Sequence, residues 1–279
     1  MDWSGNVKVL DNLRAKYGEL SASEKKIADF IMRDPEGAVN CNVSELANAS
    51  GTSDATIIRF CKHAGYSGYY ELRITLSREL GRIDQAHKTD NGGDSVSAVL
   101  QKYASDILSL ARNLDDNMIQ KCARILEDCS FVHIVAAGNT TSLANYMGFR
   151  LGRLGIRTTY HTLQEYILND ISMAGEKDIV FAISQSGTSK TVVKAMELAK
   201  SRKLQTMAVV GYRNSPVSRL ADYLLPAIVT EQYFDYIKNY AHLYEMAVID
   251  VLLEQIAKDR KRQKVNLDIP EMLVSDSKL

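Results

Sequence analysis

The sequence predicts two domains, an all-α domain at the N-terminus followed by an α/β domain with a central parallel sheet. Residues up to about 80 show helical periodicity, whereas residues 84–95 (DQAHKTDNGGDS) are polar and show none. After them, short apolar runs alternate with helical segments, as is typical of βαβ units. We therefore expect one domain over 1–83, a linker over 84–95 and a second domain over 96–279.

The composition is that of an ordinary globular protein, with 46% hydrophobic and 24% charged side chains in 279 residues. The 34 basic and 34 acidic residues cancel, which by itself argues against a nucleic-acid partner. Their distribution reverses that argument, because residues 59–82 hold five basic and two acidic side chains. The cysteines form no C-x-x-C pair or zinc-type cluster, so we expect free thiols in a reducing compartment and no metal site. Without a signal peptide or a membrane-spanning run, the protein is expected to be cytoplasmic with no membrane partner.

The N-terminal helices are predicted mainly from their first turns. Ser21 and Glu24 have the spacing of a capping box, and an apolar face follows them. Pro35 ends or interrupts that helix. Further helices are expected to start near Asn42, Ser53 and Gly68.

Residues 43–62 predict a helix-turn-helix. Two helices that cross steeply need a small residue where they touch, and Ala47 supplies it. The tight turn needs a residue that tolerates positive φ, and Gly51 follows four residues later. Ile57 and Phe60 would then pack the second helix back onto the first.

The second helix of this motif has a short, polar and basic face, which fits a DNA major groove. On a wheel of about 100° per residue, Ile58 falls on the buried side and Arg59 on the opposite side. Arg59 is the best candidate to read guanine, and Lys62 suits a phosphate. The predicted DNA contacts are Thr52, Ser53, Thr56, Arg59 and Lys62. An ordinary helical hairpin with a solvated polar face is the alternative that spacing alone leaves open.

The surrounding sequence resembles the DNA-binding domain of the RpiR family of transcriptional regulators. The matching segments are LSASEKKIA at 20–28, SELA at 44–47, ATIIRFC at 55–61 and GYSGY at 65–69. This resemblance implies double-stranded operator DNA as a partner.

Five apolar runs of the second half are predicted to form the strands of the sheet. They are residues 131–137, 157–161, 178–184, 205–211 and 223–227. Helices are expected over about 96–113, after Asp115 and over about 236–258.

Two strand-to-helix turns look suited to an anion, namely those within 134–142 (IVAAGNTTS) and 181–191 (FAISQSGTSKT). Unpaired N–H groups and the dipole at a helix N-terminus attract phosphate, and the carboxyl ends of parallel strands are where open sheets bind ligands. The predicted ligand contacts are Gly138, Asn139, Thr140, Ser184, Gln185, Ser186, Gly187 and Ser189. The alternative is that these hydroxyls only cap helices.

Residues 125–230 resemble the sugar isomerase (SIS) domain, the usual C-terminal partner in the RpiR family. Ser184, Ser186, Gly187 and Ser189 match the S-x-S-G-x-T motif with which that family holds phosphate. The first turn matches more loosely, since Ala136 and Thr140 replace a usual glycine and serine; Thr191 likewise stands where an acidic residue is common. The resemblance implies a three-layer α/β domain with a five-stranded parallel sheet that binds a sugar phosphate.

SIS folds also serve isomerases, which need a base to move a proton next to a carbonyl. Candidates are Glu231, His161 and Glu165, although their places in a loop, at a strand end and on a solvated helix favour an ordinary structural role. The fused helix-turn-helix favours a sensor, so we predict no enzymatic activity, no catalytic residue and no cofactor. Two other hypotheses stay open: an isomerase with an accessory helical domain, and a DNA-binding protein whose SIS half only oligomerises.

Helix-turn-helix proteins usually bind two half-sites as dimers. We therefore expect a homodimer or homotetramer, formed through the apolar helices 96–113 and 236–258. A sugar phosphate that prefers one arrangement of subunits would change operator affinity, as befits a regulator of carbohydrate metabolism.

Overall fold

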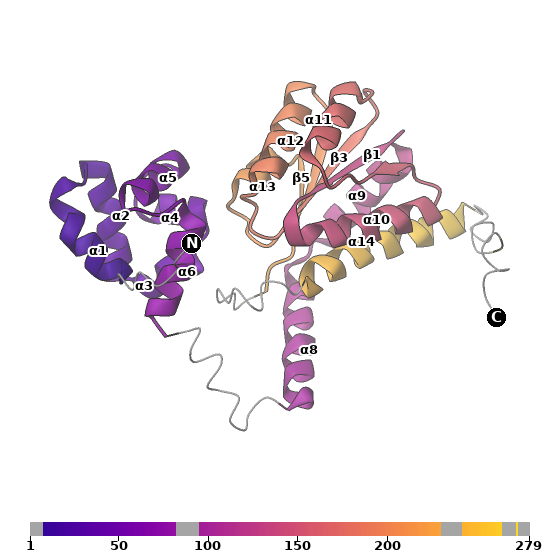
Figure 1. Cartoon of the computed structure of the whole chain (residues 1–279). Helices are drawn as coiled ribbons and strands as arrows, with labels where there is room; N and C mark the ends of the chain where they lie inside the picture. Colours follow the sequence, from indigo (N-terminus) through magenta and orange to yellow (C-terminus); the bar gives the residue numbers. More distant parts are fainter. Residues whose placement is uncertain (1–7, 82–94, 230–241, 264–271, 273–279) are drawn as a thin grey trace. The chain divides into compact units, whose positions relative to one another are not determined.

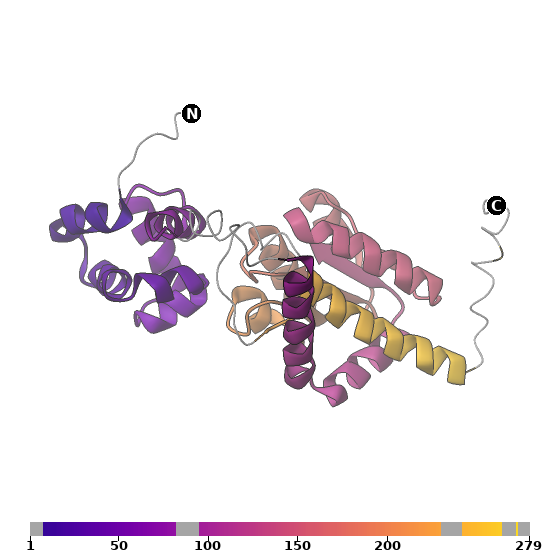
Figure 2. The same cartoon turned by 90° about the horizontal axis from the view of Figure 1, so that it is seen from below.

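The computed structural model describes residues 8–81, 95–229, 242–263 and 272 (Figures 1 and 2). The chain divides into two compact units, and the division falls between Ser105 and Asp106, inside helix α8 (Val96–Asn113). Of the predicted linker 84–95, only Ser95 belongs to the described residues. None of the helices in the described ranges has both the length and the apolar character needed to cross a bilayer.

The first unit is all-helical, as predicted. Its elements are α1 (Val9–Lys16), the 3-10 turn η1 (Tyr17–Glu19), α2 (Ala22–Arg33), α3 (Pro35–Asn40), α4 (Val43–Ala49), α5 (Asp54–His63) and α6 (Tyr69–Glu79). These helices gather around one apolar core, which includes Leu13, Ile27, Leu46, Phe60 and Leu76. The bundle thereby fixes the helix-turn-helix formed by α4 and α5.

Helix starts in this unit follow the predicted capping pattern. The Ser21 hydroxyl accepts from the Glu24 backbone N–H, and the Glu24 carboxylate accepts from the Ser21 N–H. Asn42 and Glu45 form the same reciprocal box at the start of α4. Pro35 does more than end α2, because it opens α3 at the first helical position, where its missing N–H costs nothing.

The second unit contains a five-stranded parallel sheet with the order β2-β1-β3-β4-β5. Its strands are β1 (Val132–Ala136), β2 (Thr158–Thr159), β3 (Ile179–Ser184), β4 (Gln205–Val210) and β5 (Tyr223–Pro226). All five predicted runs become strands. The run 157–161 is shorter than expected, because β2 lies at the edge and only two of its residues pair with β1.

Helices cover both faces of this sheet, which gives the predicted three layers (Figure 1). One face carries α9 (Asp116–Asp128), α10 (Thr141–Arg153) and α14 (Leu243–Arg262); the other carries α11 (Gln164–Met173), α12 (Lys190–Ser201) and α13 (Pro216–Leu220). Side chains alternate accordingly, with Phe181 in the first core and Val180 and Ala182 in the second.

The last helix lies further along the chain than its predicted range of 236–258. α14 begins at Leu243, and residues 236–241 lie outside the described part of the chain. It continues to Arg262 because its last turn holds three basic residues, which stabilise the negative end of the helix dipole.

The strand order places a topological switch point between β1 and β3. The chain leaves β1 toward β2 on one side, whereas β3 and the later strands lie on the other. Ligands of open α/β sheets bind beyond the carboxyl ends of the strands at such a point. Here those ends lead into the 3-10 turn η2 (Gly138–Thr140) and into the turn at residues 184–189.

Candidate functional site

The helix-turn-helix of α4 and α5 has the packing that its spacing predicts. Ala47 is buried at the contact, and Ile57 and Phe60 are fully buried beneath α5. Gly51 has a φ of +63°, so the turn uses the left-handed region that favours glycine. A hydrogen bond of 2.6 Å from Ser44 Oγ to Asp54 Oδ2 joins α4 to the first turn of α5.

The predicted DNA contacts lie along the outer side of α5 and at its start. Ser53, Arg59 and Lys62 are exposed, and Thr52 and Thr56 are partly exposed. Arg59 Nη2 donates to Thr56 Oγ1 at 3.2 Å, and that hydroxyl lies 2.9 Å from Ser53 Oγ. These three polar side chains thus form one connected group at the N-terminal half of α5.

Two details of this face differ from the expectation. Ile58, which the wheel places on the buried side, is 37% exposed. It is a DNA-facing candidate that the sequence analysis missed, since apolar side chains contact the thymine methyl group. Arg73, counted in the basic excess, is only 6% exposed and donates to the backbone carbonyls of Val39 and Asn40. Arg82 lies outside the described residues.

The turn at residues 184–189 is shaped by close backbone contacts. Gly187 has a φ of +65°, and a Cβ there would lie 2.1 Å from Ser215 Oγ. Gly187 donates its N–H to the Ser184 carbonyl, and its own carbonyl accepts from the Val217 N–H at 3.0 Å. The Gln185 carbonyl accepts from the Gly211 N–H at 2.9 Å. The turn therefore sits tightly between β3 and the segment that follows β4.

The N-terminus of α12 opens directly onto this turn. Its N-cap residue, Ser189, makes no side-chain capping bond, so the first N–H groups of the helix carry no side-chain acceptor. Ser186 Oγ accepts from Thr188, whereas the Ser184 and Ser189 hydroxyls make no hydrogen bond within the described residues. Such a set of unused N–H and O–H donors suits an anion with several oxygens.

The other predicted turn, which contains η2, lies beside the 184–189 turn. Gly138 has a φ of +64°, and Gly138 and Asn139 are both exposed. Thr140 is buried, and its single hydroxyl hydrogen is shared between the carbonyls of Ala137 and Ile183, each 3.1 Å from Oγ1. Thr140 thus joins η2 to the end of β3, so the two turns share one edge of the sheet.

The candidate isomerase residues lie near α11. His161 Nε2 is 3.1 Å from Asp170 Oδ2, and Glu165 is exposed in the first turn of the helix. The neighbouring Gln164 accepts from the Thr191 hydroxyl of α12 at 3.1 Å, so this end of α11 reaches the second anion turn. Glu231 lies outside the described residues.

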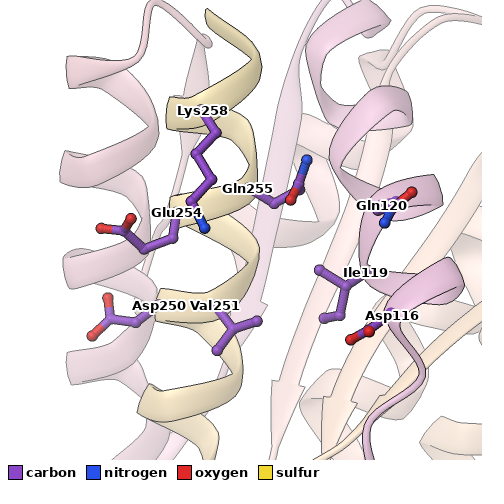
Figure 3. A pocket seen from close by; sticks show the side chains of 8 residues that line it. All are labelled: Asp116, Ile119, Gln120, Asp250, Val251, Glu254, Gln255 and Lys258. Carbon is purple, nitrogen blue, oxygen red and sulfur yellow. The ribbon is translucent and has the colours of Figure 1, made fainter. Parts of the chain in front are cut away.

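A hollow of about 480 Å³ lies elsewhere, between α9 and α14 (Figure 3). Ile119 of α9 and Val251 of α14 line it, together with Gln255 and several charged side chains at its margin. None of the predicted site residues belongs to its lining, and the lining residues lie on helices rather than at the strand ends.

Known proteins match both halves of this chain. Residues 7–82 match the helix-turn-helix domain of the rpiR family, and residues 125–256 match the SIS domain. An HTH-type transcriptional regulator of Caldanaerobacter subterraneus subsp. tengcongensis is 30% identical over 259 residues, which are 90% of this chain and 91% of that protein. The chain belongs to the RpiR family of transcriptional regulators.

Other matches span the same two domains of this RpiR-family regulator. The regulator HexR of Pseudomonas aeruginosa is 24% identical over 88% of the chain and 87% of its own length. The solved structure of Vibrio vulnificus NanR in complex with ManNAc-6P covers 95% of this chain and 97% of that one, with a TM-score of 0.82 and 22% identity. That likeness shows the same fold.

Proposed function

We propose that this RpiR-family regulator binds operator DNA through α5 and that a sugar phosphate bound in the SIS domain changes its operator affinity. One observation carries the proposal: the chain that bears the helix-turn-helix also bears an anion-shaped turn at the switch point of its sheet. The domains that we propose are 1–83 for DNA and 96–279 for the ligand, joined by 84–95. The protein would act in the cytoplasm, where its operator lies.

The exposed polar group on α5 supports the DNA part of the proposal. Arg59 would read a guanine through its forked guanidinium, with Thr56 and Ser53 holding it in place. Lys62 and Thr52 would contact phosphates. Ile58 would add an apolar contact beside Arg59. The five DNA contacts predicted from the sequence include no apolar residue.

The phosphate would lie against the N-terminus of α12, where Ser184, Ser186 and Ser189 add hydroxyl donors around the Gln185–Gly187 backbone. Gly138 and Asn139 would form the facing wall. Because the Thr140 hydroxyl is already bonded to two carbonyls, we assign it a positioning role. The NanR structure, which holds ManNAc-6P, makes that compound one probe to use.

A dimer through α8 and α14 would connect ligand to DNA. α8 exposes Val96, Leu100 and Leu108, at 78%, 59% and 62%, and α14 exposes Val251 at 46%. Apolar side chains exposed at helical spacing are typical of a surface that a second chain covers. A ligand that favours one arrangement of two such chains would change the spacing of the paired α5 helices.

The decisive experiment measures operator affinity with and without a panel of phosphosugars, using a duplex selected from a random pool. We expect at least one phosphosugar to change the Kd for DNA by about fivefold or more. Arg59→Ala should weaken specific DNA binding by about 1–3 kcal/mol and leave ligand binding intact. Ser184→Ala with Ser186→Ala should weaken ligand binding and leave DNA binding intact. Damage to both functions by either variant, without unfolding, would contradict this division of labour.

Steady-state isomerase assays on the same phosphosugars test the competing function. Gln164 accepts from Thr191 of α12, and Glu165 is the next residue of the chain, so Glu165 is the candidate base that supports a test for an enzyme. We expect no turnover, because the fused helix-turn-helix gives the site a use as a sensor. Robust turnover would replace the sensor by an isomerase.

A further inference from the structure

At the start of α14, two largely buried polar side chains make no well-formed hydrogen bond within the described residues. The side chains of His242 and Glu245 are 10% and 1% exposed. Neither ring nitrogen of His242 nor Oε2 of Glu245 makes a well-formed hydrogen bond within the described residues. Their nearest atoms, Nδ1 and Oε2, are 3.9 Å apart, beyond hydrogen-bond distance. Buried polar atoms are nearly always paired, so three unpaired atoms on neighbouring turns need a reason.

These side chains stand next to the anion site. The His242 ring approaches the backbone of Asn139 in η2, the turn that follows β1, closely enough for a weak hydrogen bond that opposes the fall of its pKa. The next residue of η2, Thr140, donates to the Ile183 carbonyl immediately before Ser184. The start of α14 therefore adjoins the same edge of the sheet as the 184–189 turn, although it is far away in the sequence.

The chemistry of the pair suits neutral hydroxyl groups. Burial lowers the pKa of His242, so its ring is neutral at physiological pH, with one nitrogen that donates and one that accepts. Burial raises the pKa of Glu245 to about 7, so a large share of its carboxyl groups is protonated and can donate as well. A sugar hydroxyl donates and accepts in the same way, whereas the phosphate group of a phosphosugar is mainly a dianion near neutral pH and mainly accepts.

We propose that His242 and Glu245 read the sugar: they hydrogen-bond hydroxyl groups of a phosphosugar whose phosphate lies in the 184–189 turn. This inference rests on the proposed function and deepens it, since it divides the site into two parts. Serine hydroxyls and helix N–H groups hold the phosphate, and the unpaired imidazole and carboxyl select the sugar attached to it. The pair accordingly acts as a specificity determinant rather than a source of general anion affinity.

Calorimetric titration tests this division, with ManNAc-6P, glucose 6-phosphate and fructose 6-phosphate as probes and inorganic phosphate as the reference. His242→Ala and Glu245→Ala should weaken the best of the three sugar phosphates at least tenfold and change the inorganic phosphate Kd less than twofold. Glu254→Ala is the matched control, because it makes the same change on an exposed part of α14 and should alter neither ligand.

Three results would overturn the inference. Variants that bind the sugar phosphate as the parent protein does would show that the pair does not touch the sugar. An equal loss for sugar phosphate and inorganic phosphate would show a general structural effect. If the parent protein bound none of the probes, the result would count against the proposed function itself, and this inference would fall with it.

The stability of the ligand-free protein gives a second readout that does not depend on the probe. If the carboxyl is kept unpaired for a ligand, Glu245→Leu should raise the thermal midpoint without ligand while it weakens sugar phosphate binding. A lower midpoint together with unchanged binding would assign Glu245 a structural role and refute the proposal. Glu245→Gln keeps the side-chain volume if the leucine variant does not fold.

Discussion

Gly187→Ala is expected to damage both the stability of the sheet-containing unit and the proposed ligand site. A left-handed φ of +65° costs a residue with a Cβ about 1–2 kcal/mol. The new Cβ would also lie 2.1 Å from Ser215 Oγ and 2.4 Å from Ser215 Cβ, and relieving such an overlap costs about 1–3 kcal/mol. The two effects together lower the free energy of unfolding by about 2–5 kcal/mol.

Urea denaturation followed by circular dichroism measures this loss, and titration with the best phosphosugar measures the effect on the site. The control is Gly152→Ala in α10, where a Cβ meets nothing within 4 Å and no positive φ is required. That variant should be stabilised by up to about 1 kcal/mol. Ser215→Gly removes the side chain that the new Cβ would overlap. When Gly187→Ala is added to the Ser215→Gly protein, it should therefore cost only about 1–2 kcal/mol, from the left-handed φ. A Gly187→Ala protein within about 0.5 kcal/mol of the parent would refute the reasoning.

Other predictions separate the roles of charged residues. Arg59→Ala should weaken specific DNA binding by about 1–3 kcal/mol without loss of stability. Arg73→Ala should instead lower the free energy of unfolding by about 1–3 kcal/mol, because two buried carbonyls lose their donor. Fluorescence anisotropy and thermal denaturation distinguish these outcomes, and an Arg73→Ala protein of normal stability would contradict the second. Burial raises the pKa of Glu245 from 4.5 to about 7, so the folded state binds its proton more tightly and stability falls as pH rises through that interval. At about 1.4 kcal/mol per pH unit the fall is about 3 kcal/mol. The lowered pKa of His242 acts in the opposite direction below 6.5. Urea denaturation across this pH range should show a downward slope that Glu245→Gln removes; an identical slope in both proteins would count against the assignment.

Local signals made the helix-turn-helix predictable. Ala47 and Gly51 act through the geometry of their own helices and turn, so their spacing carries the motif. Which side chains of a helix are buried by other helices could not be predicted from such local signals. A wheel drawn for α5 alone cannot tell that the flank with Ile58 stays uncovered, and a count of charges cannot tell that α6 turns Arg73 inward to α3. Both depend on packing between elements that the pattern of one element does not contain.

The proposed ligand site likewise has one part that the sequence predicts and one part that it does not. The 184–189 turn was predictable because a strand, a glycine and a hydroxyl-rich helix start follow one another in sequence. The sequence analysis did not find His242 and Glu245. No sequence motif links the start of α14 to η2, and only the tertiary fold brings these two segments together. β2 proved shorter than its apolar run because its length is set by pairing with β1.

The three backbone hydrogen bonds that hold the 184–189 turn have a consequence for signalling. They tie the turn to itself, to Gly211 after β4 and to Val217 of α13, so its shape is established when the chain folds. Ordering a loop of that kind upon binding would cost about 1–2 kcal/mol per residue. A phosphosugar that docks into a preorganised turn avoids this loss. If the proposed function holds, the free energy of phosphosugar binding would then remain available to change the operator affinity.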